Sequence, residues 1–307
     1  MKDFIDIVDL DAGQVQELLD LAVTLKKEHF SGGNKPLFKG KTLAMIFQKP
    51  SLRTRVSFDM AMRHMGGDAL YLSPAEIGLG KREAIGDIAQ VLSGYVDVLM
   101  ARVFDHAHVV ELAKYADVPV INGLSDLSHP CQAMADALTI QEKFGSLKGL
   151  TVSFIGDGNN VAVSLMQISL MLGANFRIAA PEGYKLPEMV VKQAAELSSK
   201  FGGQFEQVGE PQLGVKNAHV VYTDTWTSMG QEDETAIREK IFAPYQVNDE
   251  LIKYANQDCI VMHCLPAHRN HELTDAVADG PHSVIFQQAH NRLHAQKAVL
   301  ARLLKVL

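Results

Sequence analysis

Short apolar runs alternate along the chain with segments of helical periodicity, and no other feature of the sequence limits the fold as strongly. The run 43–46 has the character of a strand buried on both faces, and apolar residues at helical spacing follow it. Strands that alternate with helices form parallel βαβ units with right-handed crossovers. The sequence therefore predicts an α/β protein whose functional side chains lie beyond the carboxyl ends of the strands.

The alternation can be assigned to residue ranges. The expected strands are residues 42–47, 69–72, 96–103, 118–121, 151–155, 175–180, 219–223, 260–263 and 283–286. The expected helices begin at a capping box at Asp11, at Ser51, and near residues 85, 107, 130, 187 and 288. Gly145 and Gly149 separate two series of this kind, which predicts two parallel-sheet α/β domains, residues 1–145 and 146–287.

Composition and charge argue against several classes of function. A formal net charge of −7 is unfavourable for a surface that binds nucleic acid or an anionic membrane. The sequence has no uncharged apolar run of about 18 residues, and its first residues lack the pattern of a signal peptide. Three cysteines make no even disulfide framework, and Cys-x-x-Cys and His-Glu-x-x-His spacings are missing. We therefore expect a cytoplasmic protein with no metal site and no nucleic-acid or membrane partner.

Residues 47–58 carry the strongest functional pattern. Ser51 stands where an apolar strand is followed by a helix, and a helix start offers unpaired backbone N–H groups to an anion. The hydroxyls of Ser51 and Thr54 and the guanidiniums of Arg53 and Arg55 are grouped at this start. Because the forked donors of arginine match phosphate oxygens two at a time, the pattern predicts an anion site. The alternative is an ordinary N-capped surface helix with solvated charges.

Other polar residues follow expected strands or begin helices, and each has a structural alternative. Arg102 ends one strand and is either a site residue or a solvated edge arginine. His129 precedes a proline at a helix start and is either functional or structural. Asp224 could bind an ammonium group or cap the next segment, and Cys264 could be a small buried apolar residue. Arg292 lies near the start of the last helix, where an anion would be favoured.

Together these motifs resemble the aspartate/ornithine carbamoyltransferase superfamily, in the same order and over nearly the whole chain. Phe-Gln-Lys-Pro-Ser-Leu-Arg-Thr-Arg at 47–55 is similar to its carbamoyl-phosphate motif, and His-Pro-Cys-Gln at 129–132 is similar to its His-Pro-x-Gln. Three further motifs resemble the ornithine branch of the superfamily: Asp224 with Ser-Met-Gly at 228–230, His-Cys-Leu-Pro at 263–266, and Asp-Gly-Asn-Asn at 157–160.

The resemblance implies a fold and a reaction. It implies a carbamoyl-phosphate domain, an ornithine domain, a last helix (288–307) that returns to the first domain, and a homotrimer. The implied reaction is transfer of the carbamoyl group from carbamoyl phosphate to the δ-amine of L-ornithine, giving L-citrulline and phosphate without a cofactor.

The resemblance also implies roles for individual residues. The residues implied to bind carbamoyl phosphate are Ser51, Leu52 through its backbone, Arg53, Thr54, Arg102, His129, Gln132, Cys264, Leu265 through its carbonyl, and Arg292. The residues implied to bind ornithine are Asn160, Asp224, Ser228 and Met229. Those implied to be catalytic are Arg53, Arg102, His129 and Cys264, the last near the δ-amine.

The chain departs from the family pattern at a few positions, which leaves other functions open. Gly78 stands where the family often has a Gln or His that reaches the neighbouring subunit, and Leu52 replaces a common Thr. A sister enzyme that uses putrescine or an N-acylated ornithine is one alternative, and a catalytically silent paralogue that binds carbamoyl phosphate is another. A dinucleotide-binding dehydrogenase is a third, but the Gly-Asp-Gly turn at 156–158 lacks the third glycine, since Val161 stands in its place.

Overall fold

The computed structural model describes residues 1–80, 82–227 and 231–306 of the 307-residue chain. The chain folds into two compact units, each with its own parallel sheet. The first unit consists of residues 1–138 and 290–307, and the second of residues 139–289. The predicted fold class, two parallel α/β sheets in one chain, is confirmed.

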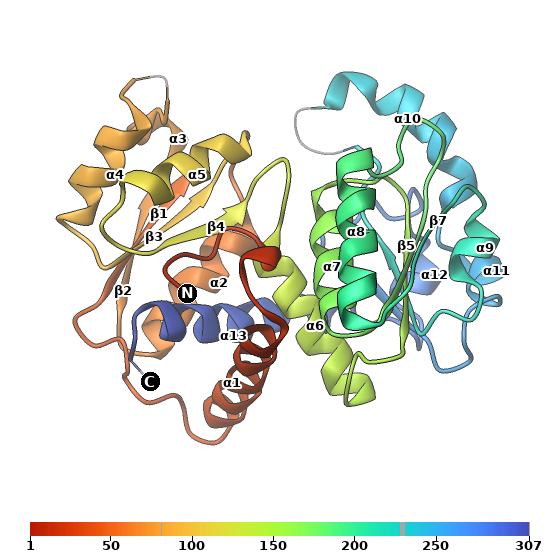
Figure 1. The fold of residues 1–307 in the computed structure, drawn as a ribbon, viewed down its shortest axis with the longest axis horizontal. Coiled ribbons are helices and arrows are strands. Elements are labelled where there is room, and N and C mark those ends of the chain that lie inside the picture. The colour runs from red at the N-terminus through yellow and green to blue at the C-terminus, as the bar shows by residue number, and fades with distance from the viewer. Residues whose placement is uncertain (81, 228–230, 307) are drawn as a thin grey trace. The chain divides into compact units, whose positions relative to one another are not determined.

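The first unit has a four-stranded parallel sheet in the order β2-β1-β3-β4 (Figure 1). Its strands are β1 (Thr42–Phe47), β2 (Asp68–Leu72), β3 (Val98–Arg102) and β4 (Val120–Leu124). The register pairs Phe47 with Arg102, so the ends of the two central strands are level. The N-terminal segment extends the sheet, because Phe4 bridges Ile121 beside β4.

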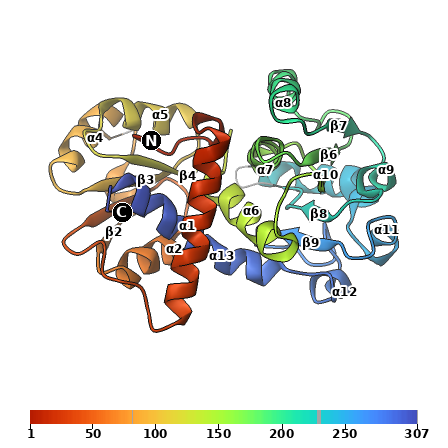
Figure 2. The same ribbon diagram turned by 60° about the horizontal axis from the view of Figure 1, so that its bottom comes forward.

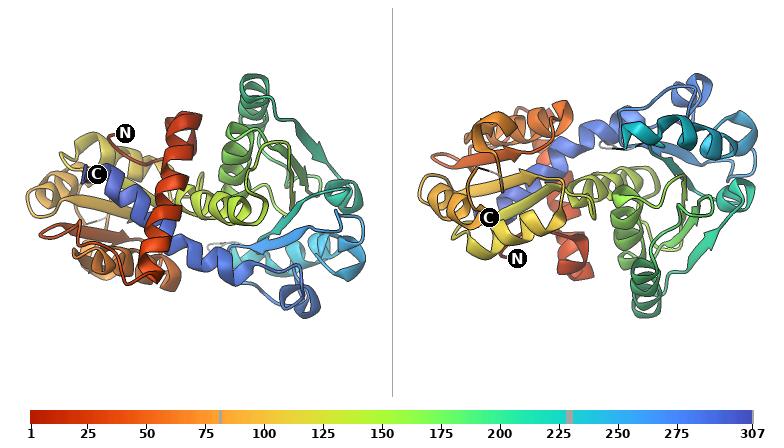
Figure 3. Two further views of the ribbon diagram at one scale, coloured as in Figure 1. Left: turned by 90° about the horizontal axis from the view of Figure 1, so that it is seen from below. Right: turned by 90° about the horizontal axis from the view of Figure 1, so that it is seen from above.

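Helices cover both faces of this sheet. They are α1 (Ala12–Phe30), α2 (Leu52–His64), α3 (Pro74–Ile77), α4 (Ile85–Ser93), α5 (His106–Tyr115), the first part of α6 (Pro130–Phe144) and the C-terminal part of α13 (Ile285–Leu303), with the 3-10 turn η1 (Ile7–Asp9). Side chains alternate across a strand, and Ala44 and Ile46 of β1 pack in one cluster with residues of α4 and α5. Figure 2 and the left panel of Figure 3 show α1 lying across α13, where Lys26 Nζ donates to Asn291 Oδ1 (2.7 Å).

The second unit has a five-stranded parallel sheet in the order β7-β6-β5-β8-β9. Its strands are β5 (Thr151–Ile155), β6 (Asn175–Ala179), β7 (Phe205–Val208), β8 (Val220–Thr223) and β9 (Ile260–His263). Its helices include α7 (Asn160–Met171), α8 (Glu188–Phe201), α9 (Pro211–Val215), α10 (Thr235–Phe242), α11 (Asp249–Ile252) and α12 (Asp275–Ala278), with the 3-10 turns η2 (Glu232–Glu234) and η3 (Ala243–Tyr245). Helices α7 and α8 cover one face and α11 and α12 the other (Figures 1 and 2).

Three local expectations were wrong. The strand expected at residues 283–286 is limited to an edge contact: the Val284 N–H bonds to the Val261 carbonyl, and α13 begins at Ile285. Strand β7 was not expected, because its apolar residues Phe205 and Val208 are separated by the polar pair Glu206 and Gln207 and form no continuous apolar run. The expected loop 73–83 contains the short helix α3, which a Ser73–Glu76 capping box starts. None of the helices in the described part of the chain has the length and apolar character needed to span a bilayer.

Candidate active site

The start of α2 is the centre of a polar cluster in the first unit. Ser51 is the N-cap, and its Oγ accepts the backbone N–H of Thr54 at 3.3 Å while its hydroxyl donates to Thr54 Oγ1 at 3.1 Å. Thr54 is buried, whereas Leu52 between them is exposed. The first turn of a helix has backbone N–H groups without helical acceptors. The position therefore combines hydroxyls with the positive end of a helix.

Two buried arginines converge on the same hydroxyl. Arg102, at the end of β3, donates from Nη1 to Thr54 Oγ1 at 3.2 Å, and Arg292, in α13, donates from Nη2 at 3.5 Å. Both side chains are buried. Like charges repel, and the repulsion is strong where water is excluded. A pair of guanidiniums held in this way favours an anion between them.

His129 and Gln132 lie beside these arginines at the start of α6. Gln132 Oε1 accepts from Arg292 Nη1 at 2.8 Å, and Gln132 Nε2 donates to Asp136 Oδ1 at 2.8 Å. Burial lowers the pKa of His129 well below its ordinary value, and the charges of Arg292 and Arg102 lower it further. The imidazole is therefore neutral at physiological pH and offers one N–H donor.

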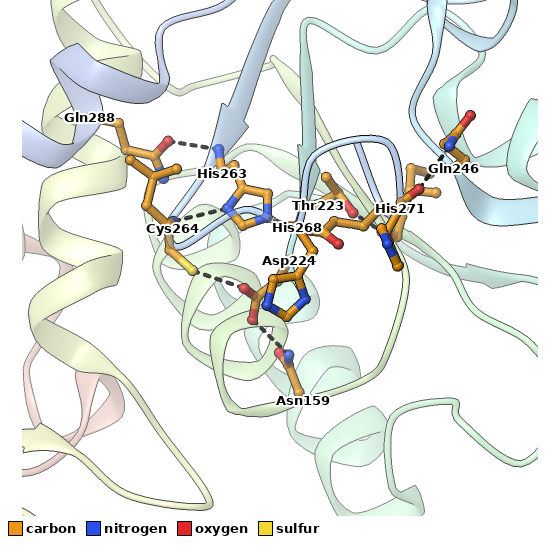
Figure 4. Close-up of polar contacts among 12 residues, drawn as sticks. Asn159, Thr223, Asp224, Gln246, His263, Cys264, His268, His271 and Gln288 are labelled. Carbon is orange, nitrogen blue, oxygen red and sulfur yellow. Dashed lines mark hydrogen bonds and ion pairs between the residues drawn. The ribbon is translucent and has the colours of Figure 1, made fainter. Parts of the chain in front are cut away.

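A second polar cluster lies in the second unit, where three neighbouring strands end (Figure 4). Asn159 follows β5, Asp224 follows β8 and Cys264 follows β9. Asn159 Nδ2 donates to Asp224 Oδ2 at 2.9 Å, and Cys264 Sγ donates to Asp224 Oδ1 at 3.0 Å. Because β5, β8 and β9 are parallel and adjacent, their carboxyl ends bring these residues together. A carboxylate oriented by two donors in this way can accept a bond from an ammonium group.

His263 supports this cluster from behind. The ring is fully buried, its Nδ1 accepts the Leu265 N–H at 2.9 Å, and its Nε2 lies 3.1 Å from Glu272 Oε1. Since Nδ1 accepts a bond, the proton of the neutral ring is on Nε2, which donates to Glu272. Gln288 Oε1 accepts the His263 backbone N–H at 2.9 Å (Figure 4). The chain at Cys264 and Leu265 is thus held on one side by His263, Glu272 and Gln288.

Asp224, His263 and Cys264 could together approach a metal ion. One ligand atom from each lies within 4.8 Å of the others. Both ring nitrogens of His263 already have partners, in Leu265 and Glu272. A metal would therefore have to replace one of these bonds before the three residues could all ligate it.

The structure gathers many of the predicted site residues into these two clusters. In the first unit they are Ser51, Thr54, Arg102, His129, Gln132 and Arg292, with Leu52 and Arg53 in the first turn of α2. In the second unit they are Asp224, Cys264 and Leu265, while Asn160 begins α7. Ser228 and Met229 lie outside the described residues. The roles implied for all of these residues stay predictions.

Three residues of these clusters were not predicted as site residues: Asn159, His263 and Glu272. Asn159 caps α7, because its Oδ1 accepts the N–H groups of Val161 and Ala162, and asparagine is a preferred N-cap residue. That preference could have identified it. Glu272 has no comparable signal, because its contact with His263 joins a loop to a strand nine residues away.

The local backbone conformation explains why position 78 is a glycine. Gly78 ends α3 in the left-handed conformation (φ 52°), and a Cβ there would lie 2.9 Å from Arg82 Cβ. Glycine is the usual residue at such a helix end. A Gln or His at this position would be strained in this loop.

Comparison with known proteins also divides the chain in two, near residues 142–148. Residues 2–142 match the family model of the aspartate/ornithine carbamoyltransferase carbamoyl-P binding domain, and residues 148–303 match that of the Asp/Orn binding domain. An ornithine carbamoyltransferase of Pyrococcus abyssi is 55% identical over 303 residues, 99% of this chain and 96% of the relative. A relative of Pyrococcus furiosus, described as an anabolic ornithine carbamoyltransferase, is 55% identical over 300 residues, 98% of this chain and 95% of its own. The solved ornithine carbamoyltransferase from Pyrococcus furiosus superposes with a TM-score of 0.97 at 54% identity, covering 99% of this chain and 97% of that one.

Proposed function

The chain belongs to the aspartate/ornithine carbamoyltransferase family, and on that basis we propose that it transfers the carbamoyl group of carbamoyl phosphate to L-ornithine. The products are L-citrulline and phosphate. The observation that carries the proposal is the convergence of Arg102 and Arg292, both buried, on the hydroxyl of Thr54 at a helix start. Such a cluster suits a phosphate, and full-length relatives are named for this reaction.

We assign carbamoyl phosphate to the first unit. Its phosphate would take the first-turn N–H groups of α2, the hydroxyls of Ser51 and Thr54, and the guanidiniums of Arg53, Arg102 and Arg292. The neutral imidazole of His129 would donate to the carbamoyl oxygen, where negative charge develops as the amine attacks. Gln132 Oε1 accepts one bond from Arg292, and its second lone pair remains suited to the carbamoyl NH₂.

We assign ornithine to the second unit. Asp224 would accept the α-ammonium, while Asn160 and the Ser228–Met229 segment would bind the carboxylate. The attacking δ-amine must be neutral, although its ordinary pKa is about 10, as for lysine. Cys264, whose Sγ donates to Asp224 Oδ1, would lie close to the δ-amine and help to control its protonation. The δ-nitrogen forms its bond to the carbamoyl carbon, the C–O bond to phosphate breaks, and the departing phosphate takes the proton that the attacking amine loses.

Three finer assignments belong to the same proposal. A homotrimer is implied by the family resemblance. A role in arginine biosynthesis is supported by the name of the Pyrococcus furiosus relative. A cytoplasmic location suits Cys131, Cys259 and Cys264, none of which forms a disulfide, because thiols persist in a reducing compartment.

A citrulline assay with purified protein, carbamoyl phosphate and L-ornithine tests the proposal directly. Citrulline is expected from ornithine, and putrescine and N-acetylornithine are expected to be poor acceptors because Asp224 would lack an α-ammonium to bind. Faster turnover with either of these would assign the chain to a sister activity. No product from any acceptor would leave carbamoyl-phosphate binding as the function, and NAD binding would favour the dehydrogenase alternative.

The phosphate assignment predicts a large loss of rate in two variants. Arg53→Ala and Arg102→Ala should each lower kcat by ~10²–10³, as removal of a preorganised donor does. Circular dichroism should show both variants folded. Turnover close to that of the wild type would contradict the assignment.

The need for a neutral δ-amine also predicts a pH profile. Activity should rise as pH increases from 6 to 9, because a larger fraction of ornithine then carries an uncharged amine. A flat profile over that range would argue against direct attack by this amine.

A further inference from the structure

Arg238 joins three segments of the second unit that are separate in the sequence. Its Nη1 donates to Asp157 Oδ2 at 2.7 Å and to the Trp226 carbonyl at 3.0 Å, and its Nε donates to Glu234 Oε2 at 2.8 Å. The guanidinium also stacks over the Tyr184 ring, 4.8 Å from its centroid. Only 5% of the residue is exposed, and its partner Asp157 is also largely shielded from water, whereas Glu234 is exposed.

Two of these contacts reach the turns that carry the candidate ornithine-binding residues. Asp157 belongs to the turn after β5, and its backbone carbonyl accepts the Asn159 N–H at 2.8 Å. Trp226 lies two residues after Asp224, in the segment that follows β8. Asn159 in turn donates to Asp224 at 2.9 Å.

The contacts therefore close a ring. It runs from Arg238 to Asp157, along the chain to Asn159, across to Asp224, along the chain to Trp226, and back to Arg238. Beyond the last sheet contact, where Thr223 Oγ1 donates to the Ile155 carbonyl at 2.7 Å, the Asn159–Asp224 bond joins the two turns at one further point. With a second connection through Arg238, the separation and the angle of the two turns are both fixed.

We propose that Arg238 is a positioning residue for the amino-acid substrate, acting through Asp157 and the Trp226 carbonyl to hold Asp224 and Asn159 in their binding geometry. The inference rests on the proposed function, since it concerns how the acceptor is bound. Arg238 itself need not touch ornithine. Its guanidinium suits the task because a planar fork can bond to a carboxylate and a carbonyl in fixed directions, which a lysine ammonium cannot.

A purely structural role is the alternative, because loss of any buried arginine destabilises a fold. The two roles differ in what they predict for the kinetic constants. A positioning role predicts weaker binding of ornithine with little change for carbamoyl phosphate. A purely structural role predicts a lower melting temperature, with both Michaelis constants unchanged in the protein that remains folded.

Arg177 provides a matched control in the same unit. It also bridges several acceptors, the carbonyls of Leu213, Gly214 and Lys216 and the carboxylate of Glu206, but none of them lies in the turns after β5 and β8. Arg177→Gln should therefore lower the melting temperature without changing the KM for ornithine. Glu234→Gln is a second control, because Glu234 is exposed and contacts Arg238 only from its own helical turn.

The experiment measures citrulline formation by Arg238→Gln, Arg238→Lys, Asp157→Asn, Arg177→Gln and Glu234→Gln, with each substrate varied in turn. Arg238→Gln and Asp157→Asn should raise the KM for ornithine about tenfold or more, because small errors in position are costly. The KM for carbamoyl phosphate should stay within about twofold. The double variant Arg238→Gln/Asp157→Asn should have a KM for ornithine only slightly higher than that of either single variant, since both substitutions break the same connection. Arg238→Lys should fall between wild type and Arg238→Gln.

The outcomes distinguish failure of the proposed function from failure of the positioning role. If the wild type forms no citrulline, the proposed function fails. If the wild type is active but Arg238→Gln and Asp157→Asn keep the wild-type KM for ornithine, the positioning role is overturned. It is also overturned if Arg177→Gln raises that KM equally. If Arg238→Gln does not fold, Asp157→Asn decides, because it keeps the size of the side chain while removing the charge.

Discussion

Arg238 in the second unit and Lys297 in the first are both buried cations, but their surroundings differ in charge. Arg238 contacts the carboxylates of Asp157 and Glu234. Their hydrogen bonds raise its pKa, although burial acts in the opposite direction. Lys297 is fully buried, and its Nζ donates to the amide oxygen of Asn34 at 2.6 Å. Burial alone lowers its pKa to about 8.

The groups around Lys297 are basic. His29 and His64 stack with ring centroids 4.6 Å apart, and His294 lies 5.5 Å from His29. These rings come from α1, α2 and α13, and Lys26 of α1 faces them as well. Burial lowers the pKa of all three histidines, and the charge of Lys297 lowers each further. One unit thus compensates its buried cation with acids, whereas the other keeps its neighbours neutral.

The difference teaches that a buried charge can be tolerated in two ways, with opposite consequences for substitution. Where the charge is paired, removing one partner leaves the other uncompensated. Where the described part of the chain places no acid beside the charge, as at Lys297, removing the charge relieves a cost.

The largest expected effect is the loss of the paired cation. Arg238→Met should lower the free energy of unfolding of the second unit by about 3–5 kcal/mol, because the Asp157 carboxylate stays buried without its partner. Trp226 is the only tryptophan of the sequence and lies in the core of this unit. Its fluorescence during denaturation at pH 7 therefore reports this unit. A loss below about 1 kcal/mol would mean that the bridge behaves like an exposed ion pair.

The next effect is a loss of stability in acid from the histidine cluster. The pKa of His294 falls from 6.5 to about 3 in the folded protein, so between these values the unfolded state binds more protons than the folded one. Stability must then decrease as pH falls. From pH 6.5 to 4.5 the loss from this residue should be ~2–3 kcal/mol.

Urea denaturation followed by circular dichroism at these two pH values measures this effect. His294→Leu should reduce the acid-dependent loss by about the amount given above for this residue, because the variant has no imidazole there to protonate on unfolding; other histidines with lowered pKa, such as His129, keep their share. His290, which is exposed on the same helix, gives a control, and His290→Leu should leave the loss unchanged. An equal loss in wild type and His294→Leu would show that the cluster does not resist protonation.

Some features of the two units could be predicted from the sequence more accurately than others. Strands such as Thr42–Phe47 and Ile260–His263 were predicted to the residue, because uninterrupted apolar runs end at polar or turn residues. The candidates at strand ends were found because parallel sheets place such residues together. The apolar run at 283–286 failed as a strand, since the same residues can begin a helix.

Long-range pairing is what the sequence could not supply. Arg238 stands in the run Arg-Glu-Lys, which has the pattern of a solvated helix face, although it is 5% exposed. Its partner Asp157 is 81 residues away. Glu272 likewise has no local feature that distinguishes it from a surface acid. Lys297 did have a signal, because it stands among apolar residues on the last helix.

The smallest effect has the opposite sign from the first. Lys297→Met should raise the free energy of unfolding of the first unit by about 1–3 kcal/mol at pH 7, since it removes a buried charge but also a hydrogen bond to Asn34. The folded pKa of Lys297 is about 8 and the ordinary value is 10.5, so wild-type stability rises between these values as the folded lysine loses its proton first. The advantage of the variant should therefore shrink over that range. Lys26→Met is the control, because Lys26 is only partly buried and should give a smaller change. If Lys297→Met instead destabilised the protein as strongly as Arg238→Met, the two buried cations would be stabilised alike, and the contrast between the units would be lost.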